Sequence, residues 1–154
     1  MNLEQLEIAI SKAPDEKSRA ALQAMKPALA AVVQSEATFV QRIEASKTAR
    51  GEGATKLSKR KKQEVDGYQS DAIELGRKHT ESLKKFERPD TIIRIIQSGL
   101  AQDIEFWGEN LKHVHQAELP IVQENLAVKR KLLGETNTFL AEFGPPLDRR
   151  LNHY

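Results

Sequence analysis

Apolar residues three and four positions apart recur along most of this chain, and their spacing constrains the fold more than any other feature. The first run comprises Leu57, Lys61, Val65, Tyr68, Ala72, Leu75, His79, Leu83 and Phe86. The second comprises Ile93, Ile96, Leu100, Ile104, Trp107, Leu111 and Val114. This spacing puts one stripe of side chains along one side of a helix, and two such stripes bury each other as in a coiled coil. No segment alternates as a strand would, so the sequence predicts an all-α protein.

Proline and glycine divide the helical pattern into pieces. Short connections make sequential helices antiparallel. We therefore expect an elongated antiparallel bundle of three long arms, near residues 14–50, 55–87 and 91–143, preceded by a short N-terminal helix. Pro27 and Pro120 each either kink a helix or open a new one, and the sequence leaves both alternatives open.

The chain length and the last proline pair suggest one domain with a tail. A chain of 154 residues suits a single hydrophobic core. The run Gly144-Pro145-Pro146 halts the last helical pattern, because proline cannot continue a helix. We assign residues 1–144 to one helical bundle domain and residues 145–154 to a C-terminal tail.

Composition and targeting patterns exclude several classes of protein. There are no cysteines, so disulfides and thiolate chemistry are absent. The N-terminus lacks the basic start and apolar run of a secretory signal, and no stretch is long and apolar enough to span a membrane. We expect a cytoplasmic protein, and export without a signal remains an alternative.

No recognisable catalytic, cofactor-binding or metal-binding motif occurs in the sequence. Nucleophile elbows, phosphate loops and zinc-protease motifs are all missing. The nearest approach to a metal site is the acidic and histidine-containing stretch from Glu105 to Glu118, but its His113 and His115 point to different sides of a helix. No histidine follows a glutamate by three positions, as a helical di-metal site requires. We expect no enzyme and no cofactor.

A basic segment is the one positive indication of a partner. From Arg42 to Lys62 the chain carries eight basic residues against two acids, although its overall net charge is only +2. In the hairpin interpretation they gather at one tip, beside the turn at Gly51 and Gly53. Such a tip suits phosphates, anionic lipids or an acidic partner, and a solvated helix end is the alternative interpretation. The candidate contact residues are Arg42, Lys47, Arg50, Lys56, Lys59, Arg60 and Lys62. Lys61 is the eighth basic residue of the segment and belongs to the first apolar run.

His79 occupies a position in the first run where Leu75 and Leu83 predict a core side chain. We interpret it as a partly buried residue that fixes helix register, and a pH-sensitive imidazole is the alternative.

Together these features predict a noncatalytic protein–protein interaction module that presents helix faces, such as an adaptor, chaperone, toxin-neutralising partner or structural subunit. Its partner is another protein of unknown identity, and a homodimer is a further expectation. The second hypothesis is a nonspecific binder of anionic membranes or nucleic acid through the basic tip. The third is a small helical enzyme or toxin.

Overall fold

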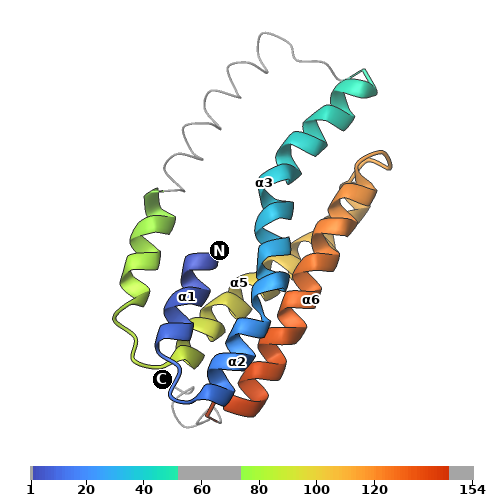
Figure 1. Ribbon diagram of the computed structural model, residues 1–154. Helices are drawn as coiled ribbons and strands as arrows, with labels where there is room; N and C mark the ends of the chain where they lie inside the picture. The colour runs from blue at the N-terminus through green and yellow to red at the C-terminus, as the bar shows by residue number, and fades with distance from the viewer. Residues whose placement is uncertain (1, 52–73, 146–154) are drawn as a thin grey trace, which may run out of the picture.

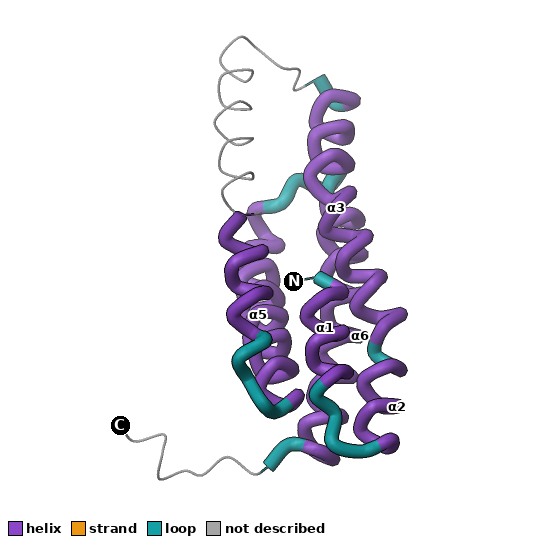
Figure 2. The backbone as a smooth tube through the Cα atoms, turned by 60° about the vertical axis from the view of Figure 1, so that its left-hand side comes forward, coloured by secondary structure: helices purple, strands orange, loops and turns teal. Residues whose placement is uncertain are grey.

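The computed structural model describes residues 2–51 and 74–145 (Figure 1). The helices are α1 (Leu3–Ser11), α2 (Glu16–Ala24), α3 (Lys26–Ala49), α5 (Pro89–Asn110), the 3₁₀ helix η1 (Leu111–His113) and α6 (Leu119–Phe143). Residues 74–83 are also helical. The described part of the chain contains helices and loops and no strand (Figure 2). The predicted all-α class is confirmed.

Local chemistry explains where several of the helices begin. Asp15 caps α2, because its side chain accepts a 2.7 Å hydrogen bond from the backbone N–H of Ser18. Pro27 lies in the first turn of α3 and Pro120 in the first turn of α6. Proline is tolerated there because the first N–H groups of a helix have no intrahelical acceptor. Both prolines therefore open new helices.

The segment predicted as one arm over 91–143 is two helices, and this part of the expected arrangement is wrong. After α5 the chain tightens into η1, and Val114 adopts an extended backbone, with φ −84° and ψ 131°. Because Pro120 then starts a new helix, α6 turns back and packs along α5. Asp103 and Lys129 meet across this antiparallel pair.

Helix α6 packs against α3 as well as α5 (Figure 1). The ion pair of Arg50 with Glu118 and the hydrogen bond of Ser35 with Asn125 show that α3 and α6 are antiparallel, since rising numbers in α3 meet falling numbers in α6. Helix α1 lies against α2, α3 and α5.

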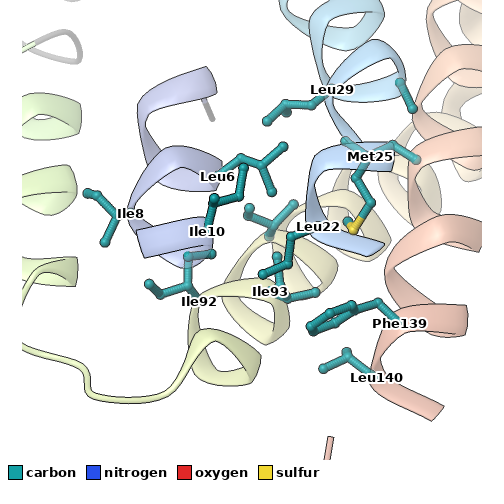
Figure 3. Packing of buried hydrophobic residues seen from close by; sticks show 14 of the residues in the cluster. Leu6, Ile8, Ile10, Leu22, Met25, Leu29, Ile92, Ile93, Phe139 and Leu140 are labelled. Carbon is teal, nitrogen blue, oxygen red and sulfur yellow. The ribbon is translucent and has the colours of Figure 1, made fainter. Parts of the chain in front are cut away.

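The hydrophobic core is formed by residues of α1, α2, α3, α5 and α6 (Figure 3). Leu6, Leu22 and Leu29 are at most 1% exposed, and Ile92 and Ile93 are fully buried. Each such side chain stabilises the fold by about 1.5–3 kcal/mol relative to an exposed one. The predicted seam from Ile93 through Leu100 thus forms core packing.

Candidate functional site

A chain of three aromatic rings connects α3 to α5 beyond the main core. The Phe39 and Trp107 rings meet edge to face with centroids 5.7 Å apart, and Phe106 meets Trp107 in the same way at 5.5 Å. Phe106 is 58% exposed, and Val40, next to Phe39, is 44% exposed. We call Phe39, Val40, Phe106 and Trp107 the aromatic face.

The described residues leave this face open because α1 is short. Helix α1 packs against α3 and α5 through its buried Leu6, Ala9 and Ile10. It begins at Leu3, and α3 and α6 continue well past the N-terminus (Figure 1). Helix α1 has 9 residues and α3 has 24, so α1 packs along only part of α3.

A buried lysine lies one helical turn below the aromatic rings. Lys129 of α6 has a side chain only 4% exposed, and its ammonium pairs with Glu36 of α3 and, at 3.4 Å, with Asp103 of α5. Asn125 of α6, 2% exposed, donates its amide to Glu36 at 3.1 Å and to the Ser35 hydroxyl at 2.8 Å. Through this network, Glu36 of α3 and Asp103 of α5 both pair with the same side chain of α6.

Acidic residues flank both exposed apolar side chains of the face. Glu36 and Glu44 lie one helical turn before and after Val40, and Asp103 and Glu109 lie one turn before and after Phe106. Residues three or four apart share a helix surface, so these acids border the apolar side chains. All four are exposed. The face is therefore apolar at its centre and acidic along both edges.

The structure describes three of the predicted basic contact residues, and two of them make ion pairs within the bundle. Arg42 pairs with Glu124 at 2.9 Å, and Arg50 pairs with the buried Glu118 at 2.7 Å. Hydrogen bonds from these guanidinium groups hold the pKa of Glu124 and of Glu118 below the usual value.

Lys47 is the third of the predicted basic contact residues that the structure describes, and it is exposed. Lys56, Lys59, Arg60, Lys61 and Lys62 lie outside the described residues, as does the tail from residue 146 onward. Whether these residues form a basic tip therefore stays a prediction.

His79 does not lie in the core, so the expected partial burial of this residue is wrong. It is exposed, and Leu75 is 66% exposed, whereas Thr80 and Leu83 are at most 1% exposed. Thr80 and Leu83 therefore lie on the buried side of residues 74–83. The buried Thr80 hydroxyl is satisfied by the Gly76 carbonyl at 2.8 Å and by the Asn2 amide at 3.3 Å.

An open groove of about 470 Å³ lies at the other end of the bundle. Its lining includes Lys12 and Asp15 near the start of α2, Arg88 and Asp90 near the start of α5, and Phe143 at the end of α6. Arg88 and Asp90 pair with each other at 3.0 Å, and Asp15 caps α2. The charged groups of Arg88, Asp90 and Asp15 therefore stabilise the fold.

The described residues offer neither a metal site nor a membrane-spanning helix. Within residues 2–51 and 74–145, no three histidine or acidic side chains are grouped as a metal site requires. In the stretch from Glu105 to Glu118, His115 approaches Glu118 to 3.3 Å, and Glu118 is held by Arg50. No helix in the described ranges is both long enough and apolar enough to cross a bilayer.

Sequence reasoning missed both the aromatic face and Lys129, although each left a signal. Phe106 and Trp107 are adjacent, and neighbours on a helix point about 100° apart, so both cannot face one narrow seam. Lys129 falls between Leu126 and Leu132 in the apolar pattern of α6, where a core residue is expected.

No protein-family model matches this chain, and no curated protein or solved structure compared with it does so either. Its function is therefore inferred from the geometry alone.

Proposed function

We propose that this protein is a noncatalytic interaction module that binds another protein through the aromatic face. The observation that carries the proposal is the exposure of Phe106 and Val40 beside a ring cluster that links two helices. Trp107 and its neighbouring rings have the composition typical of binding hot spots, where aromatic side chains dominate.

The remaining geometry supports binding more than catalysis. The buried polar groups of the network satisfy one another: Lys129 is neutralised by Glu36 and Asp103, and Asn125 donates to two acceptors. A general acid or base must lie within hydrogen-bond reach of the proton that it transfers, and the centre of the aromatic face presents apolar side chains. The bundle instead provides a rigid support for an exposed contact surface.

Affinity capture with matched variants tests the proposal. We expect Phe106→Ser to lose the partners that the wild-type chain retains, because truncation of a central aromatic residue typically costs at least about 2 kcal/mol of binding. The matched control is Leu75→Ser, which removes an apolar side chain of similar exposure from residues 74–83. Partners that both variants retain, with both still folded by circular dichroism, would contradict the proposal.

Sedimentation of the purified chain tests whether the partner is a second copy. If the face is a homodimer contact, the wild-type chain sediments as a dimer and Phe106→Ser as a monomer. A dimer that persists in Phe106→Ser would place the self-contact elsewhere.

A further inference from the structure

The aromatic face combines an apolar centre with acidic edges, and this combination restricts what can bind there. Residues one turn from Val40 and Phe106 include four carboxylates, Glu36, Glu44, Asp103 and Glu109, and no basic residue. Beneath the face, the Lys129 ammonium pairs with two of them, Glu36 and Asp103. Glu44 and Glu109 add negative charge at the end of the face away from Lys129.

The shape of the site follows from its supporting helices. Helix α1 packs against both α3 and α5, so these two helices already hold a helix between them in the part that α1 occupies. The aromatic rings bridge the same two helices outside the core cluster to which α1 contributes. An amphipathic helix laid along such a surface contacts it through residues at positions i, i+3, i+4 and i+7.

We infer that the partner segment is a basic amphipathic helix, whose apolar stripe covers Phe106 and Val40 and whose lysine or arginine residues meet Glu44 and Glu109. This inference rests on the proposed function and specifies its partner. The aromatic rings favour the same partner, because arginine and lysine also bind over the face of tryptophan. A helix with acidic flanks is disfavoured, since like charges across an interface oppose association.

Fluorescence of Trp107 reports directly on this site, because it is the only tryptophan in the chain. The probe is a synthetic helix of leucine and lysine, about 18 residues or five turns long, that contains no tryptophan. A leucine–glutamate peptide with the same apolar stripe is the matched control. We expect the lysine peptide to shift Trp107 emission to the blue and to protect it from acrylamide, with binding that weakens as salt rises.

Two charge variants distinguish a contact at the face from general attraction to an acidic surface. Glu44→Gln with Glu109→Gln removes two acids of the face that do not hold Lys129. We expect affinity for the lysine peptide to fall about threefold to tenfold, from about 0.3–0.7 kcal/mol for each exposed pair. The control, Glu87→Gln with Glu142→Gln, removes the same charge from the groove at the other end of the bundle and leaves affinity unchanged.

The outcomes separate this inference from the proposed function. Equal binding of the two peptides, or no shift of Trp107 with either, overturns the basic-helix inference, while the capture experiment still decides whether the face binds a protein. Equal losses in the two charge variants also overturn it, because the attraction is then not specific to the face. The basic-helix inference is also overturned if the chain forms a homodimer that Phe106→Ser dissociates and the lysine peptide leaves intact. In that case the face is the contact with a second copy.

Discussion

The buried network around Lys129 predicts an asymmetry between removing its cation and removing its acids. The Lys129 side chain is 4% exposed, whereas those of Glu36 and Asp103 are 50% and 58% exposed. If Lys129 is replaced by Met, a residue of similar length, the two acids stay solvated and a costly buried ammonium disappears. If the acids become Gln and Asn, the buried ammonium remains and loses its neutralising partners.

The expected changes in the free energy of unfolding follow from these exposed fractions. Ion pairs with exposed partners contribute at most about 1 kcal/mol each, and removing a buried charge offsets part of that loss. We therefore expect Lys129→Met to change the free energy of unfolding by no more than about 1 kcal/mol. Leaving a buried charge unpaired costs about 3–5 kcal/mol. The double variant Glu36→Gln with Asp103→Asn should lose about 2–4 kcal/mol, since amide oxygens still accept hydrogen bonds from the ammonium.

Urea unfolding followed by circular dichroism measures both variants on one scale. The control is Glu81→Gln, which breaks the exposed Lys84–Glu81 pair of 3.1 Å and should cost no more than about 0.5 kcal/mol. The reasoning is refuted if Lys129→Met is destabilised more than the double variant. That result would mean that Lys129 stabilises the bundle chiefly through its charge, and that its burial costs little.

Three further perturbations test other parts of the structure. A Cβ added at Gly108 meets nothing within 4 Å, so Gly108→Ala should raise the free energy of unfolding by about 0.5–1 kcal/mol in urea titrations, and a loss would indicate a contact that the structure lacks. Leu83 is fully buried, so Leu83→Ala should cost about 2–5 kcal/mol by the same assay, and a cost under about 1 kcal/mol would mean that residues 74–83 are not packed on the core. Arg50 lowers the pKa of Glu118, so the pair stabilises the fold above the usual glutamate pKa and this contribution is lost as pH falls below it. Thermal melts should therefore show Glu118→Gln less stable than wild type at about pH 7, with the difference shrinking towards about pH 3, and a difference constant with pH would contradict this assignment.

Helical periodicity by itself determines the fold class of this chain. The spacing from Ile93 to Leu100 predicts a helix with one buried stripe, and those residues form part of the core. Asp15 caps α2 through a hydrogen bond with a residue three positions along the chain, because capping depends on a few neighbouring residues. Such features are local, so the sequence alone carries them.

The tertiary structure decides which side of residues 74–83 is buried and which polar residues of different helices contact each other. His79 and Thr80 are adjacent, and only packing against α1 and its Asn2 cap shows that Thr80 faces inward. Among the described residues, the core cluster to which α1 contributes does not include the aromatic face, and no pattern within α1 or α3 alone encodes that difference. Lys129 finds its two acids on two other helices, 93 and 26 positions away along the chain. These contacts depend on how separate helices are placed in space, because burial and ion pairing are properties of the assembled bundle and not of any one segment.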